Sequence, residues 1–137
     1  MNQSTVPART RAFLIFCAVG LVPIALSYGA VPGASLEYLF GIAVESTNAT
    51  HVFRAVMGLY LAMVATWLAG AFNPTLTVPA LACCAVFMLG LAAGRVLSLI
   101  LDGVPHWLLV VYLALELVLG LIAVHLLRQH RAGVGAA

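Results

Sequence analysis

The sequence predicts an all-α fold: a four-helix transmembrane bundle, up-down-up-down, with a short interfacial helix between helices 1 and 2. Of the 137 residues, 64% are hydrophobic and only 7% are charged, whereas a soluble domain carries about 25% charged residues. The apolar residues also gather in four runs, each close to the roughly 20 residues that cross a bilayer as a helix. We therefore expect one integral membrane domain over residues 1–137, surrounded by the lipid bilayer.

The four spans are expected at residues 12–30, 50–71, 77–101 and 106–127. The first run follows two arginines, as in a signal peptide, but it is long enough to span and three further spans follow it. We therefore interpret it as a retained helix, kinked at Pro23. The turns at 72–75 and 102–105 are short, and short links make sequential helices antiparallel neighbours.

The connector between the first two spans, residues 31–49, is longer than the others and predicts a short helix in the membrane interface. Its apolar residues share one helical face, and its two glutamates fall off that face. These residues are Leu36, Leu39, Phe40 and Ala43, with Glu37 and Glu45.

The arginines predict the orientation, because cytoplasmic loops of membrane proteins carry an excess of positive charge. Four of the six basic residues lie in the two tails, and the first and third connectors carry only acids. Both termini are therefore expected to be cytoplasmic. An aromatic belt would then place Trp67 near the inner interface and Trp107 near the outer one.

Several classes of function receive no support from the sequence. The cysteines lie in apolar runs and lack zinc or haem spacing, so we interpret them as small buried hydrophobes: Cys17, Cys83 and Cys84. The basic residues are too few for a nucleic-acid interface. No catalytic, cofactor-binding or metal-binding motif is present, so the sequence favours a protein that is not an enzyme.

Three charges fall inside the predicted spans: Arg54, Arg95 and Glu116. At 1.5 Å per residue they lie about 8, 10 and 15 Å below the outer ends of their helices, so they can meet in the outer half of the membrane. Each belongs to a polar stripe, and we expect the stripes to face one another with Glu116 neutralising one or both arginines. The other stripe residues are His51, Ser98, Asp102 and Tyr112, while membership of Tyr60 is left open. Small residues expected to let the helices pack closely are Gly58, Gly90, Gly94 and Gly120.

Such charges have both functional and structural interpretations. Two buried arginines against one buried glutamate leave a spare positive charge, which favours binding of an anionic small molecule or lipid head group. In the first alternative the protein is an accessory or assembly subunit, and the charges are structural staples between helices. In the second alternative it is a component of proton-coupled transport, with His51, Tyr112 and Glu116 as a relay. A membrane-protein partner or a homo-oligomer is compatible with each.

These residues resemble a family of bacterial membrane proteins, domain of unknown function 4345. The run 48–55 followed by Gly58-Leu59-Tyr60 resembles its second-helix signature. Gly94-Arg95 with Ser98 and Asp102-Gly103 resembles the third, and Glu116 with Gly120 resembles the fourth. The resemblance implies four helices in a bacterial inner membrane and no established activity. It also implies that the family pattern includes Arg54, Arg95, Asp102 and Glu116.

Overall fold

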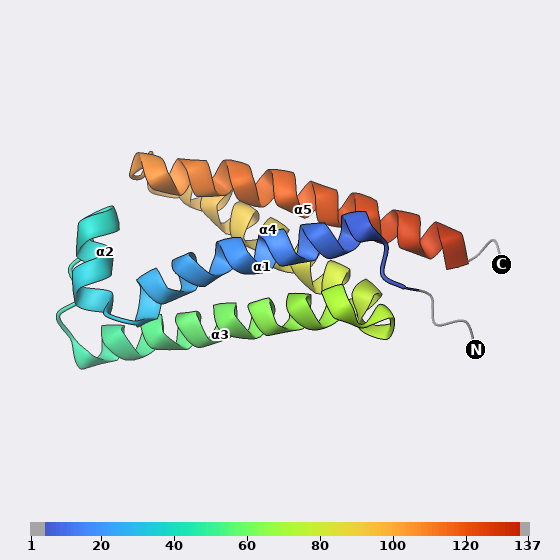
Figure 1. Cartoon of the computed structure of the whole chain (residues 1–137). Helices are drawn as coiled ribbons and strands as arrows, with labels where there is room; N and C mark the ends of the chain where they lie inside the picture. Colours follow the sequence, from blue (N-terminus) through green and yellow to red (C-terminus); the bar gives the residue numbers. More distant parts are fainter. Residues whose placement is uncertain (1–4, 135–137) are drawn as a thin grey trace.

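The structure is a computed structural model that describes residues 5–134, which fold into five helices (Figure 1). Four of the helices are long and apolar enough to cross a membrane, and the short α2 separates the first two of them. The predicted all-α, four-helix bundle is therefore confirmed. The helices are α1 (Ala8–Gly29), α2 (Pro32–Phe40), α3 (Thr47–Phe72), α4 (Pro74–Leu101) and α5 (Trp107–Val134).

The connections between the long helices are as short as the sequence predicts. Asn73 alone separates α3 from α4, and its side-chain oxygen accepts a hydrogen bond from the backbone N–H of Thr75 at 3.0 Å. Pro74 occupies the first position of α4, where a missing N–H costs nothing. Because the turns at Asn73 and at 102–106 are tight, α4 runs antiparallel to α3, and α5 runs antiparallel to α4 (Figure 1).

The short helix α2 ends earlier than predicted. Gly41 follows Phe40 with φ of +68°, a left-handed conformation that closes the helix, and residues 41–45 continue without helical structure. Ala43 and Glu45 therefore lie beyond α2 rather than on it. The helix lies across one end of the bundle, which we name the α2 end. The opposite end, where α1 begins and α5 ends, is the termini end (Figure 1).

The long helices form two pairs, α1 along α3 and α4 along α5, joined by contacts between α3 and α4. The core between them contains fully buried Leu14, Trp67 and Leu81. Trp67 belongs to this core, since its ring is 0% exposed and packs edge-to-face on Phe87 with centroids 5.6 Å apart. Its depth near the inner interface stays a prediction. Trp107 is 65% exposed at the start of α5.

The predicted packing glycines mostly lie where no neighbour approaches. A β-carbon added at Gly58, Gly90 or Gly94 would have no atom within 4 Å. The helix surfaces at these three glycines therefore do not pack against another helix within the described chain. Gly120 does lie in a close contact, since an added β-carbon there would come 2.6 Å from a side-chain carbon of Leu89.

The closest helix approaches occur at two glycines that the sequence did not single out. Gly29 of α1 lies against Met57 of α3, and Gly70 of α3 lies against Ala80 of α4. Both glycines are buried. Small residues therefore do allow close packing of these membrane helices, but at other positions than the GxxxG spacing indicates.

Candidate functional site

The centre of the candidate site is an ion pair between Arg95 of α4 and Glu116 of α5. The Arg95 Nε donates to both carboxylate oxygens of Glu116, at 2.9 and 2.8 Å. The Glu116 side chain is 9% exposed and that of Arg95 is 20% exposed. Because the short turn makes α4 and α5 antiparallel neighbours, the two charges meet at the same depth. The predicted neutralisation of Arg95 by Glu116 is confirmed.

Aromatic side chains surround this pair. The guanidinium carbon of Arg95 lies 5.7 Å from the ring centroid of Tyr112, within the range of a cation–π contact. Tyr60 of α3 is buried on the other side, with its ring 5.1 Å from that of Phe87. The sequence left open whether Tyr60 belongs to the site. It does belong, because it lines the same cavity as the ion pair.

A chain of ring contacts links the site to the α2 end. Tyr112 contacts Phe40 of α2 at 6.3 Å, Phe40 contacts Tyr28 of α1 at 6.2 Å, and Tyr28 contacts Tyr60 at 5.7 Å. Sequence reasoning missed Tyr28 and Phe40. Their aromatic character at the matching depth was a usable signal, but nothing in the sequence showed that α2 folds back over the other helices.

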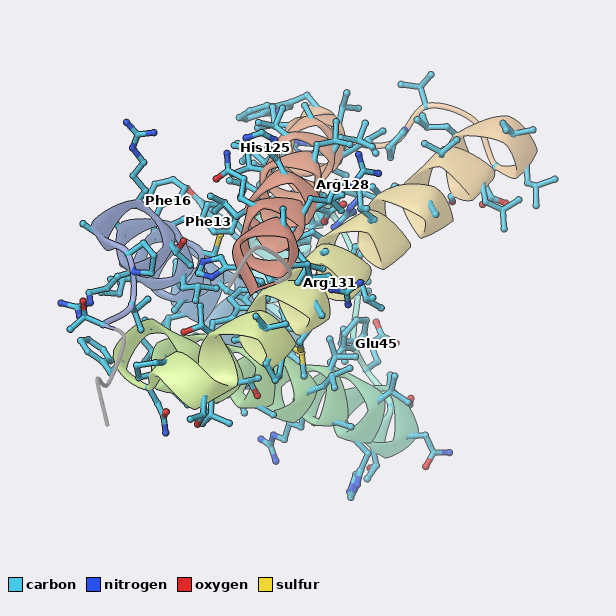
Figure 2. The ribbon with its side chains drawn as sticks, turned by 90° about the vertical axis from the view of Figure 1, so that its right-hand side faces the viewer. Phe13, Phe16, Glu45, His125, Arg128 and Arg131 are labelled. Carbon is cyan, nitrogen blue, oxygen red and sulfur yellow. The ribbon has the colours of Figure 1, made fainter. Side chains whose placement is uncertain are left out.

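The ion pair lies on the wall of a cavity of about 130 Å³ between α1, α3, α4 and α5. Apart from Arg95, Glu116 and the two tyrosines, the lining is apolar. On the side between α1 and α5 it includes Phe16, which is 63% exposed, the exposed Gly20, and Leu115, which is 49% exposed. This side of the cavity is formed by surface residues, and Figure 2 shows Phe16 on the outer side of α1.

The remaining predicted residues of α4 lie beside the site and do not join the pair. The Ser98 hydroxyl donates to the carboxylate of Asp102 at 2.5 Å, and both side chains are exposed. Ser98 and Arg95 share a second, smaller cavity of about 80 Å³ toward Pro105. Asp102 therefore neutralises no buried charge.

The prediction that Arg54 joins the site is not met, and the same holds for His51. Both side chains are exposed on α3, and neither forms a hydrogen bond or ion pair with another residue in 5–134. Tyr60, Val64 and Trp67 form the buried face of α3. Because each residue turns a helix by about 100°, Arg54 points about 120° away from this face. The site therefore contains one arginine and one glutamate, with no spare positive charge.

The fold and the site define a small four-helix membrane protein with an ion pair buried between its last two spans. The chain belongs to the family described as Domain of unknown function (DUF4345), whose sequence model matches residues 9–127. The match covers α1 to α4 and most of α5, and it confirms the resemblance. Neither a curated protein nor a solved structure matches the chain.

Proposed function

We propose that this protein binds an amphipathic small molecule that enters from the bilayer and places a hydrogen-bond-accepting head group against Arg95. One observation carries the proposal. Arg95 pairs with Glu116 through Nε alone, and the Tyr28 hydroxyl also lies within reach of its guanidinium. A guanidinium has five N–H donors, so with Nε on Glu116 and one donor shared with Tyr28, several remain for a ligand in the cavity that Arg95 lines.

The charge balance favours a neutral head group. Glu116 already neutralises Arg95, so an added carboxylate or phosphate would leave a net negative charge in a low-dielectric site. Burying an unbalanced charge is costly, whereas a carbonyl oxygen that accepts N–H donors is satisfied without one. A ketone, ester or quinone carbonyl therefore fits the site better than the anion that the sequence alone suggested.

The apolar part of the ligand has a matching surface. The cavity of about 130 Å³ is smaller than the roughly 300–1,000 Å³ of sites that enclose a drug-sized ligand. We therefore expect it to hold the head group and the first carbons only. The rest of the molecule would lie along Phe16 and Leu115, between α1 and α5, in contact with lipid tails.

Three probes with the same twelve-carbon body test this proposal: dodecane, methyl dodecanoate and dodecanoate. Thermal unfolding of the purified protein in detergent is expected to shift upward with the methyl ester and to change little with dodecane. A ligand at 100 times its Kd stabilises by about 2.7 kcal/mol. The matched control is the double variant Arg95→Met/Glu116→Met, which lacks the donors without leaving a lone charge and should lose the shift.

Three outcomes would contradict the proposal. Equal shifts with dodecane and the ester, or an ester shift that persists in the double variant, would remove Arg95 from the binding site. A shift with dodecanoate alone would show that the ligand is an anion, as the sequence first suggested.

A purely structural role of the ion pair, in an accessory or assembly subunit, is the second candidate function. The double hydrogen bond favours this role, because both carboxylate oxygens of Glu116 accept a hydrogen bond from Arg95. A proton relay through His51 receives no such support, since His51 is exposed on α3 and away from the pair.

We further propose a bacterial inner membrane as the location, with both termini in the cytoplasm. The distribution of charge supports this orientation, because four of the six arginines gather at the termini end and the three exposed acids at the α2 end. Figure 2 shows two of these arginines near the end of α5. The basic residues are Arg9, Arg11, Arg128 and Arg131, and the acids are Glu37, Glu45 and Asp102.

Cysteine labelling in whole cells tests this orientation. In a background where the native cysteines are replaced by alanine, Ala34→Cys in α2 should react with a membrane-impermeant maleimide, whereas Ala132→Cys should react only after the membrane is opened. Both positions are exposed, so folding does not shield either one. The reverse pattern would invert the proposed topology.

A further inference from the structure

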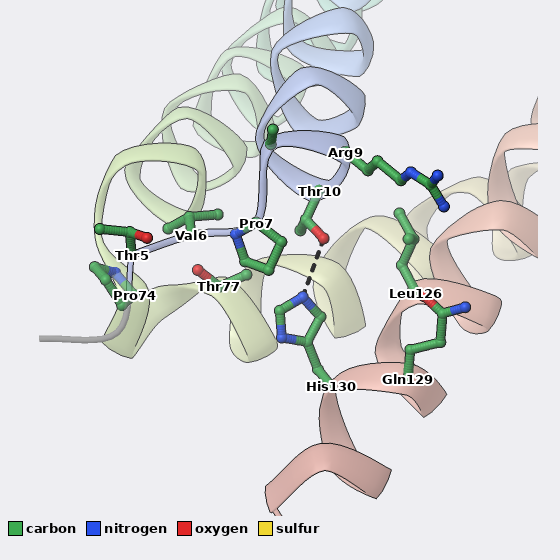
Figure 3. Close-up of a pocket in the computed structure, with 11 residues that line it drawn as sticks. Thr5, Val6, Pro7, Arg9, Thr10, Pro74, Thr77, Leu126, Gln129 and His130 are labelled. Carbon is green, nitrogen blue, oxygen red and sulfur yellow. Dashed lines mark hydrogen bonds between the residues drawn. The ribbon is translucent and has the colours of Figure 1, made fainter. Parts of the chain in front are cut away.

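A third cavity, of about 480 Å³ (Figure 3), lies at the termini end of the bundle and shares no lining residue with the ion-pair cavity. Three segments distant in sequence form it: residues 5–10, the start of α4 and the last turns of α5. Figure 3 shows their side chains converging from these three directions. We name it the termini-end pocket.

The polar side chains of this pocket are held in place by the fold. Thr10 is 2% exposed, and its hydroxyl lies 3.0 Å from Nε2 of His130, which joins α1 to α5 (Figure 3). Thr77 is also 2% exposed and donates to the carbonyl of Gly70 at 2.9 Å. The second ring nitrogen of His130, Nδ1, forms no hydrogen bond with another described residue, so it can meet a ligand.

The charge around the pocket is uniformly positive. Arg9 lines it, and the other basic side chains of the two tails, Arg11, Arg128 and Arg131, lie at the same end of the molecule. Every acid of the sequence lies elsewhere: Glu37, Glu45, Asp102 and Glu116. The described lining of the pocket therefore combines a cation, a fixed imidazole and hydroxyl or amide groups with no acidic side chain.

We infer that the termini-end pocket binds the phosphate of an anionic phospholipid from the adjacent leaflet. The pocket lies where α1 begins and α5 ends, so in a bilayer crossed by these two helices it would face the lipid head groups. Arg9 and His130 supply charge and hydrogen bonds to the phosphate, and the apolar Leu126 beside them supplies a surface for the lipid body. Basic residues next to a membrane attract anionic lipids by about 1 kcal/mol each. This inference is independent of the ligand proposed for the ion-pair cavity.

Arginines at a cytoplasmic end also serve as a topology signal, so the test must separate a built site from a diffuse positive field. Arg9 and Arg11 provide the matched pair. Both are exposed arginines of the first turn of α1, but only Arg9 lines the pocket. Substitution of either one removes the same charge, and neither removes a buried side chain.

Lipid affinity of the full chain is measured by native mass spectrometry titration in detergent. The probes are dihexanoyl phosphatidylglycerol, dihexanoyl phosphatidylcholine and glycerol 3-phosphate. The wild type is expected to bind the phosphatidylglycerol at least tenfold more tightly than the other two. Arg9→Gln should weaken this binding about tenfold, and Arg11→Gln less than twofold. His130→Phe keeps a ring in place but removes both nitrogens, and it should weaken binding as well.

Each alternative gives a distinct result. Equal weakening by Arg9→Gln and Arg11→Gln would mean that only the general field attracts the lipid and would overturn the site. Equal affinity for glycerol 3-phosphate would assign the pocket to a soluble phosphate and overturn the lipid proposal. Equal affinity for phosphatidylcholine would show that charge is not recognised, which also overturns it.

Discussion

Replacement of Glu116 by leucine is expected to lower the free energy of unfolding by about 3–5 kcal/mol, the cost of breaking a buried ion pair on one side. The variant leaves Arg95 between α4 and α5 with no carboxylate within reach among the described residues. A guanidinium cannot shed its charge by losing a proton. The measurement is reversible unfolding of the purified protein in bicelles.

The double variant Arg95→Leu/Glu116→Leu is the control, and it is expected to be more stable than Glu116→Leu. Removing both charges leaves no buried ion, and polar contacts between membrane helices contribute only about 0.6–2 kcal/mol. Arg95→Leu alone should fall between the two, because a lone carboxyl group can become neutral by taking up a proton. If Glu116→Leu is as stable as the double variant, Arg95 has another partner or reaches water, and the pair is not what stabilises this region.

Gly70→Ala is expected to destabilise the fold by about 1–3 kcal/mol, the usual cost of forcing an extra carbon into a well-packed contact. The added β-carbon would collide with the β-carbon of Ala80 and lie 3.0 Å from the backbone oxygen of Leu76. Neither group can turn aside, because one is the first atom of its side chain and the other is backbone. The helices α3 and α4 must therefore separate, which the same unfolding measurement detects.

Gly90→Ala makes the same chemical change on α4 and serves as the matched control. A β-carbon at Gly90 would meet nothing within 4 Å, and alanine favours a helix over glycine by up to about 1 kcal/mol. We expect this variant to be unchanged or slightly more stable. Equal destabilisation by Gly70→Ala and Gly90→Ala would show that the close approach of α3 and α4 is not a stabilising contact.

The spans and the ion pair could be predicted because they depend on position along the chain. Hydropathy predicts where a helix crosses the bilayer, and a short turn predicts that the next helix is its antiparallel neighbour. Depth and adjacency together then bring Arg95 and Glu116 into contact. The turn at 72–75 illustrates the same logic, since its asparagine and proline both favour a helix boundary.

The rotation of each helix could not be predicted, for a physical reason. Lipid tails are as apolar as a protein core, so a membrane helix has no polar face to mark its outside. The sequence therefore predicts that Arg54 faces the other charges, whereas the structure leaves it exposed on another face of α3. The GxxxG positions Gly90 and Gly94 were misplaced in the same way, whereas the contacts at Gly29 and Gly70 lacked any spacing signal.

The location of both charges within α4 and α5 also bears on how the chain enters the membrane during synthesis. Arg95 and Glu116 are separated by 21 residues and one tight turn, and the bond between them joins α4 directly to α5. These two helices can therefore enter the bilayer together as a hairpin whose charges already neutralise each other. We therefore expect the last two helices to insert without prior assembly with the first two, because pairing lowers the energetic barrier that a lone arginine would create.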